Sequence, residues 1–196
     1  MLDCLKQGGF EQRLVEVAKA TPDNNIVDYK LVWREPLVTW LSPSLHMTLL
    51  GDAAHCHLPT SAQGGSQALE DGVALAIALD RAKGDVPLGL QVFERIRYNR
   101  SHVVHQASIS VRDGLHNVEW NGDFIKKNPH VIALPRPDWV IEYDIARESD
   151  RNFDSLAADV KRGRKGTIQE LALPAGGDYS PEALRHKASK AVRALL

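Results

Sequence analysis

Residues 47–71 read MTLLGDAAHCHLPTSAQGGSQALED, and this stretch carries the clearest pattern in the chain. Its apolar start, Met47–Leu50, is typical of a short strand that ends at Asp52. A polar loop containing Pro59 follows, and a helix is predicted to begin at Gly64. This order places a carboxylate at a strand end and the unpaired N–H groups of a helix start a short distance away. Together they suit a ligand with hydroxyl groups in its middle and an anionic or carbonyl group at one end.

Several segments in and around this stretch match one known motif. They are Gly51–His55, Pro59, Gln63–Ser66 and Glu70–Gly72, with further likeness in Ile26–Arg34 and Val92–Arg100. Together they resemble the second flavin-binding motif of the FAD-dependent aromatic hydroxylases, which are single-component flavin monooxygenases. The salicylate-hydroxylase-like branch is the nearest match, and the likeness covers residues 1 to about 150.

The resemblance implies FAD as the cofactor, with NADH or NADPH as the electron donor of the complete enzyme. It implies these cofactor-binding residues: Asp52, Pro59, Gln63, Gly64, Gly65 and Ser66. Asp52 would accept hydrogen bonds from the ribityl hydroxyls, and Pro59 would lie beside the reactive edge of the flavin. The helix start would offer backbone N–H groups to the pyrimidine end of the ring. The alternatives are a carboxylate that caps a turn and an ordinary glycine-rich helix start.

The glycines of the chain do not form the Gly-x-Gly-x-x-Gly turn that holds the ADP half of FAD in such enzymes. They form the doublets Gly8-Gly9, Gly64-Gly65 and Gly176-Gly177. The predicted fold class is therefore an α/β or α+β fragment. It would be the helix-rich C-terminal part of the FAD/NAD(P)-binding monooxygenase fold, lacking the N-terminal dinucleotide-binding βαβ unit. We expect weak or no FAD affinity and no independent catalysis from this chain alone.

Composition limits the classes of partner. The chain has 196 residues, of which 43% are hydrophobic and 25% charged, as in ordinary globular proteins. A net charge of -1 gives no general attraction to nucleic acid. Two cysteines form no disulfide framework, and no apolar run approaches the ~20 residues of a membrane span. We expect a cytoplasmic protein whose partner is a small aromatic substrate.

Apolar spacing and breakers predict the secondary structure. An amphipathic helix is expected before Thr21, with a break at Gly8-Gly9, and longer helices are expected over residues 64–83 and 87–116. The predicted strands are Val27–Trp33, Val38–Leu41 and His46–Leu50. Short helical turns are expected within residues 117–150, and Ser180 is expected to cap a terminal helix.

Four segments are predicted from these elements. Residues 1–45 would be a remnant of the substrate-side region, and residues 46–116 would hold the flavin-binding motif and the long helix. Residues 117–150 would wrap the body, and residues 151–196 would form a basic, partly flexible extension.

Charged side chains on the two long helices have simpler interpretations. Adjacent helical residues point apart, so Glu70 and Asp71 are not expected to share a proton. Asp71 is expected to fix its helix to a neighbouring loop. A solvated helix face is the expected role of Arg95, Arg97 and Arg100, with phosphate binding as the alternative.

Three functions from different classes remain open. The first is part of a flavin-dependent monooxygenase, completed by the missing half. The second is a non-catalytic protein-interaction module, with self-association through the face that the missing half leaves uncovered. The third is a metal site at His55, Cys56 and His57, although a spacing of one residue between histidines is not a specific zinc pattern and no metal ligand is assigned. His55 is expected to form a hydrogen bond inside its loop.

Overall fold

The computed structural model describes residues 2–22, 25, 27, 29, 34, 36–116, 121–127 and 138–164. The chain divides into two compact units, Met1–Leu31 and Val32–Leu196, and each is described by itself. Within the described ranges, no helix is both long enough and apolar enough to cross a membrane.

The first unit contains α1 (Leu2–Gln7) and α2 (Gln12–Ala20), with the break between them at the predicted glycine doublet. Gly9 has a φ of 67°, a left-handed conformation that glycine adopts without strain. Helix α2 buries Val15 and Ala18 on one side, as the apolar spacing predicted. It ends at Thr21, whose backbone N–H and hydroxyl both donate to the Val17 carbonyl.

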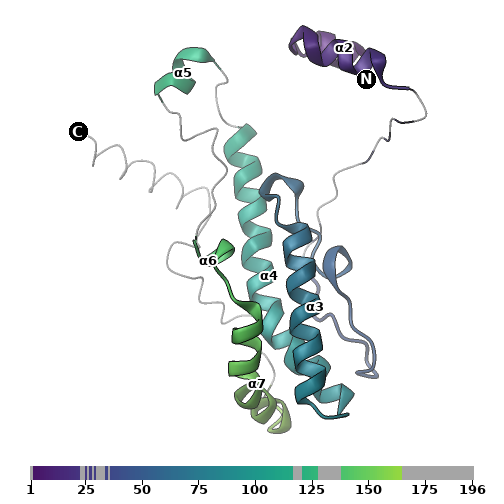
Figure 1. The fold of residues 1–196 in the computed structure, drawn as a ribbon, viewed down its shortest axis with the longest axis vertical. Coiled ribbons are helices and arrows are strands. Elements are labelled where there is room, and N and C mark those ends of the chain that lie inside the picture. Colours follow the sequence, from purple (N-terminus) through teal and green to yellow (C-terminus); the bar gives the residue numbers. More distant parts are fainter. Residues whose placement is uncertain are drawn as a thin grey trace. The chain divides into compact units, whose positions relative to one another are not determined.

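The second unit is built on three packed helices, α3 (Gly64–Arg81), α4 (Val86–His116) and α7 (Ile145–Lys161) (Figure 1). The two long helices begin within one residue of the predicted positions. Helix α3 presents the small residues Ala74 and Ala78 to the core, where both are fully buried. Small side chains let the larger Phe93 of α4 and Phe153 of α7 fill the space between the helices.

The connection between α3 and α4 is tight. Lys83 and Gly84 both have positive φ, and the Asp85 carboxylate accepts a hydrogen bond from the Leu88 N–H at 3.1 Å, which caps α4. A Cβ atom on Gly89 would lie 3.0 Å from the Leu79 side chain. The first turns of α4 therefore pack closely on the last turns of α3.

Short elements complete the second unit. They are two 3₁₀ turns, η2 (Gly51–Ala53) and η3 (Pro59–Ser61), and the short helices α5 (Gly122–Lys127) and α6 (Asp138–Ile141). The last two are short helical turns within residues 117–150, as predicted. Helix α7, capped by the Asp144 carboxylate, continues through residue 150. The predicted segment boundary at residue 150 thus falls inside a helix.

The predicted strands Val38–Leu41 and His46–Leu50 are wrong. In their place the structure has one isolated antiparallel bridge between Leu41 and Thr48. Such a pair needs further strands on its free edges to become a sheet, and the described residues supply none. The helix-rich character of the prediction is confirmed. Most of the predicted strand Val27–Trp33 and the whole terminal helix capped by Ser180 lie outside the described residues.

Candidate functional site

The turn that carries Asp52 depends on the glycine before it. Gly51 is buried with a φ of 54°, and a Cβ atom there would lie 3.3 Å from the Ala68 side chain. Its carbonyl accepts hydrogen bonds from the N–H groups of Ala54 and His55, at 2.9 and 2.8 Å. These bonds close the 3₁₀ turn and leave the Asp52 side chain exposed to solvent.

The Asp52 carboxylate lies beside the start of α3. The Cβ position of Gly64 is 3.8 Å from Asp52 Oδ1. Gln63 is the N-cap residue, and its side chain makes no capping hydrogen bond. The first helical bond runs from the Gln67 N–H to the Gln63 carbonyl. An acceptor and the uncapped donors of a helix start are therefore adjacent, as the sequence predicted.

This corner of the second unit is open. Nothing lies within 4 Å of the Cβ position of Gly65. The side chains of Asp52, Pro59 and Ser66 are exposed, and Gln63 and Gly64 are half-buried. At Gly65 a planar ring can therefore approach the backbone without a side chain of that residue in the way. The donors and the acceptor present fit the carbonyl-bearing ring and the hydroxyl-bearing chain of FAD.

The loop between Asp52 and α3 is braced from two sides. The Arg34 guanidinium donates to the carbonyl groups of Asp52 and Ala53, at 2.7 and 3.3 Å. On the other side, the Leu58 N–H donates to the Ser108 hydroxyl at 3.2 Å, and the Thr60 hydroxyl donates to the Ser108 carbonyl at 2.7 Å. The exposed part of the loop thus rests on fixed contacts to α4.

A buried ion-pair network lies between α3 and α4. Arg97 is completely buried and donates through Nε to Asp71 at 2.8 Å, and its Nη1 pairs with Glu70. Arg100 donates to both carboxylate oxygens of Glu70, at 2.7 and 2.8 Å, and to the carbonyl of Trp139, which ties α6 to α4. The predicted solvated face is therefore wrong for Arg97 and Arg100, because α3 supplies carboxylates and carbonyls that replace water.

Asp71 links this network to the loop. Its Oδ2 accepts from the Gly51 N–H at 3.0 Å and contacts His55 Nε2 at 2.5 Å. The prediction that Asp71 fixes its helix to a loop is confirmed. Burial by itself raises the pKa of Asp71, but the hydrogen bonds from His55 and Arg97 outweigh it and hold that pKa below its usual range. Asp71 is therefore a carboxylate at neutral pH.

Buried histidines continue the network away from Asp71. His55 Nδ1 lies 3.1 Å from His57 Nδ1, which confirms a hydrogen bond inside the loop, and His57 Nε2 lies 3.1 Å from the Ser101 carbonyl. Burial lowers the pKa of His57 to about 3 and that of His102 to about 4. Among the residues that the structure describes, no three His, Cys, Asp or Glu side chains are grouped as metal ligands.

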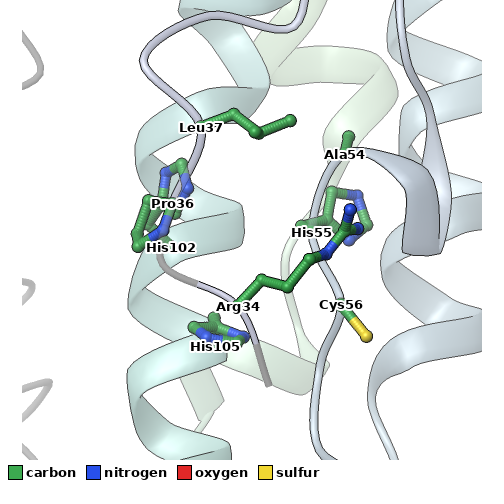
Figure 2. A pocket seen from close by; sticks show the side chains of 8 residues that line it. All are labelled: Arg34, Pro36, Leu37, Ala54, His55, Cys56, His102 and His105. Atoms are coloured by element: carbon green, nitrogen blue, oxygen red, sulfur yellow. The ribbon is translucent and has the colours of Figure 1, made fainter. Parts of the chain in front are cut away.

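A small pocket lies next to these histidines (Figure 2). Its lining residues are Arg34, Pro36, Leu37, Ala54, His55, Cys56, His102 and His105. It has room for about one water molecule. None of the six predicted cofactor-binding residues lines it, and a flavin ring is far larger, so this pocket is not the candidate FAD site.

Comparison with known proteins agrees with the geometry of the loop and α3. The FAD binding domain family matches residues 46–85. The FAD-dependent monooxygenase nanF of Aspergillus nanangensis is 36% identical over 179 residues, which are 91% of this chain. The FAD-dependent monooxygenase okaB of Penicillium ochrochloron is 35% identical over 93% of this chain. This chain is related to the FAD-dependent monooxygenases.

The chain corresponds to only part of such a monooxygenase, since it spans 38% of nanF and 40% of okaB. The crystal structure of FqzB matches 77% of this chain with a TM-score of 0.63 and 39% identity, and that match covers 34% of FqzB. A crystal structure of CtdE in complex with FAD and a substrate matches 65% of this chain with a TM-score of 0.58 and 38% identity. The cofactor of the family is FAD.

Sequence reasoning missed the inward direction of Arg97 and of His102. The signal was present in the spacing. Phe93, Arg97 and Ser101 recur every four residues along α4 and share one buried side. On α3, Gln67, Asp71 and Ala74 share the buried side in the same way. When each of two neighbouring helices has a charged residue at the same spacing as its core residues, the pattern predicts a buried ion pair between the helices.

Proposed function

We propose that this chain forms the isoalloxazine side of the FAD site in a flavin-dependent monooxygenase that hydroxylates a small aromatic substrate with NADH or NADPH and dioxygen. The salicylate-hydroxylase-like character of the motif supports the aromatic substrate. Because the chain spans less than half of its relatives, this activity belongs to a longer protein or assembly. Bound FAD supplies the redox chemistry, and the protein supplies position and charge.

One observation carries the proposal: the exposed Asp52 carboxylate lies against the uncapped start of α3. In this arrangement Asp52 accepts hydrogen bonds from the hydroxyl groups of the cofactor. The N–H groups of Gly64, Gly65 and Ser66 would bind the carbonyl-bearing end of the ring and would favour negative charge there. Pro59 is exposed at the first position of η3 and, as the family resemblance implies, would border the site on the substrate side.

A titration of the isotope-labelled chain with FAD tests this proposal. Half of a site binds weakly, so we expect a Kd near 1 mM, about -4 kcal/mol. The amide signals of Gly64, Gly65 and Ser66 should shift most. Asp52→Ala should weaken binding about tenfold, because a charge-assisted hydrogen bond contributes roughly 1.5–3 kcal/mol. The readout is the set of amide chemical shifts against FAD concentration.

The matched control is Asp80→Ala, which removes an exposed carboxylate at the far end of the same helix and should leave the titration unchanged. Two results contradict the proposed site. One is a set of FAD-dependent shifts that leaves out the helix start, and the other is equal binding by the wild type and the Asp52→Ala variant.

A second candidate, an interaction module, is favoured by the outer face of α3. Leu69 and Val73 are four residues apart and lie on one side of the helix, and their side chains are 76% and 40% exposed. Leucine and valine are among the residues that are most often buried in folded proteins. We infer that this face, defined by Leu69 and Val73, self-associates when the rest of the monooxygenase is absent.

Sedimentation of the chain over a hundredfold range of concentration tests this inference. The average mass should rise with concentration, and Leu69→Lys should return the chain to a monomer, because a charge cannot be buried without a partner. Ile141→Lys places the same charge at another exposed apolar position, in α6, and should not change the mass. A wild-type monomer at every concentration argues against the module.

A further inference from the structure

Behind the Asp52 turn, a chain of polar contacts runs through the protein interior from α3 to α4. It connects Asp71 Oδ2 to His55 Nε2 at 2.5 Å, His55 Nδ1 to His57 Nδ1 at 3.1 Å, and His57 Nε2 to the Ser101 carbonyl at 3.1 Å. The side chains of Asp71, His55 and His57 are all buried. Each contact in such a series needs one donor and one acceptor, so the positions of the protons can be worked out from the ends inward.

The Ser101 end fixes the proton of His57. A backbone carbonyl only accepts, so His57 Nε2 carries the proton and donates to it. Burial lowers the pKa of His57 to about 3, which leaves the ring neutral. A neutral imidazole has one N–H and one acceptor nitrogen. His57 Nδ1 is therefore an acceptor, and His55 Nδ1 must donate to it.

The Asp71 end fixes the second proton. Asp71 also accepts from the Gly51 N–H and from the Arg97 guanidinium, and these donors keep it a carboxylate. An ionised carboxylate only accepts, so His55 Nε2 donates to it. Both ring nitrogens of His55 are then donors. Only the doubly protonated, positively charged form of histidine has two.

The surroundings of His55 suit a cation. The Asp71 carboxylate is in direct contact, and the Trp40 ring centroid lies 5.4 Å from that of His55, within the range of cation–π attraction. Arg97 faces the opposite oxygen of Asp71 and is itself paired with Glu70. Neutral His55 leaves two alternatives. In one, the unprotonated Nε2 of His57 faces the Ser101 carbonyl, so two acceptors meet at 3.1 Å. In the other, His57 carries the charge, but the Asp71 carboxylate contacts His55 and not His57, so the charge is placed on His55.

We propose that His55 is a buried imidazolium that acts as the positioning residue of the loop Gly51–Pro59. Asp71 holds this loop at two points, the Gly51 N–H and the His55 ring, and Asp52 lies between those points. The His57 ring then connects the loop to α4 through its contact with the Ser101 carbonyl. The importance of this loop for FAD rests on the proposed function, but the charge and the restraint are properties of this chain alone.

The protonation state is tested by long-range proton–nitrogen correlation spectra of the histidine rings in the full 196-residue chain at pH 7. His55→Gln identifies the His55 signals by their loss. We expect both His55 nitrogens to be protonated and His57 to carry one proton, on Nε2. A His55 ring with a single proton overturns the proposal, and neither result depends on FAD binding.

The restraint is tested by hydrogen exchange followed by mass spectrometry. The backbone amides of residues 54 and 55 donate to the Gly51 carbonyl, and in His55→Gln they should exchange about tenfold faster. The amides of α7 should keep their wild-type rates. His46→Gln, at an exposed histidine nearby in sequence, should change neither. Equal rates in the loop, or equal acceleration in the loop and α7, overturn the positioning role. If His55→Gln does not fold, the His55 signals are identified in the wild type by nuclear Overhauser effects to Trp40, whose ring centroid lies 5.4 Å from that of His55, and the spectra then decide the charge.

Discussion

Arg97→Met is expected to lower the free energy of unfolding of the second unit by about 3–5 kcal/mol. The guanidinium of Arg97 is completely buried, and it donates to Asp71, Glu70 and the Gln67 side chain. Methionine has a similar length but carries no donor and no charge. The buried Asp71 carboxylate would therefore lose a hydrogen bond and a neutralising charge that water cannot replace. Small domains are stable by only about 5–15 kcal/mol, so this loss is a large share of the total.

Urea unfolding followed by the fluorescence of buried Trp40 measures the effect of Arg97→Met. Arg95→Met is the matched control. It makes the same change two residues earlier on α4, where the arginine is only partly buried and its hydrogen bond to the Arg164 carbonyl is exposed. It should cost less than about 1 kcal/mol. A loss for Arg97→Met as small as that for Arg95→Met would contradict the role given to the buried network.

Acid is expected to destabilise the second unit well above the range in which carboxylates titrate. Burial lowers the pKa of His57 to about 3 and that of His102 to about 4, while both groups have a pKa near 6.5 in the unfolded chain. Between pH 6.5 and 4 the unfolded state therefore binds more protons than the folded state, and stability falls as the pH falls. From pH 7 to pH 5 we expect a loss of about 2–4 kcal/mol.

The groups that face these rings are accounted for in this expectation. His57 is next to His55 and His105, and the positive charge of His55 lowers the pKa of His57 further. Asp71 has a pKa below its usual range, so its contribution is lost only at a pH below this window. The charge proposed for His55 acts in the opposite direction and offsets part of the loss, because the folded chain already binds the proton that the unfolded chain binds only in part. The remaining slope belongs mainly to the two buried rings.

Urea unfolding at pH 7, 6 and 5 measures this pH dependence. His57→Gln removes one of the two titrating rings and should reduce the slope by about half, whatever the stability of that variant at pH 7. His46→Gln changes an exposed ring and should leave the slope unaltered. A free energy of unfolding that stays constant from pH 7 to pH 5 would show that the rings are not buried as neutral groups.

The helices of this fold could be predicted because their signals are local. The start of α3 at Gly64 and that of α4 beside Pro87 follow from glycine and proline positions and from apolar spacing. The strands could not be predicted in the same way. The apolar run that ends at Leu50 has a strand-like pattern, but a strand forms only when neighbouring strands pair with it. The residues of the run do not show whether such strands are present.

Helix α7 shows a different reason for failure. Its buried side consists of Ser149, Phe153 and Ala157, and two of these are small residues that add little to apolar density. The segment was therefore assigned in part to a basic extension that begins at residue 151, although the spacing of four residues continues across that boundary. Periodicity was the better guide here than composition.

The order of the backbone elements at the candidate site could be predicted from the sequence, but the contacts of the buried side chains behind it could not. The order of strand-like run, Asp52, loop and glycine-opened helix placed the carboxylate beside the helix start. The partners of Arg97 and His55 depend on how α3 and α4 face each other, which is a property of packing. The sequence predicted a hydrogen bond of His55 inside its loop but not its contact with Asp71, and it predicted a solvated position for Arg97. The roles of the six cofactor-binding residues remain predictions.

The exposed leucine and valine on the outer side of α3 make the stability of this unit depend on its surroundings. Leu69 and Val73 lie side by side only in the folded helix, so a molecule that needs both residues together binds the folded chain in preference to the unfolded one. By mass action, it then stabilises the fold in proportion to the logarithm of its concentration once binding is saturated. A melting temperature measured on the solitary chain is therefore a lower bound on the value reached when that side is occupied.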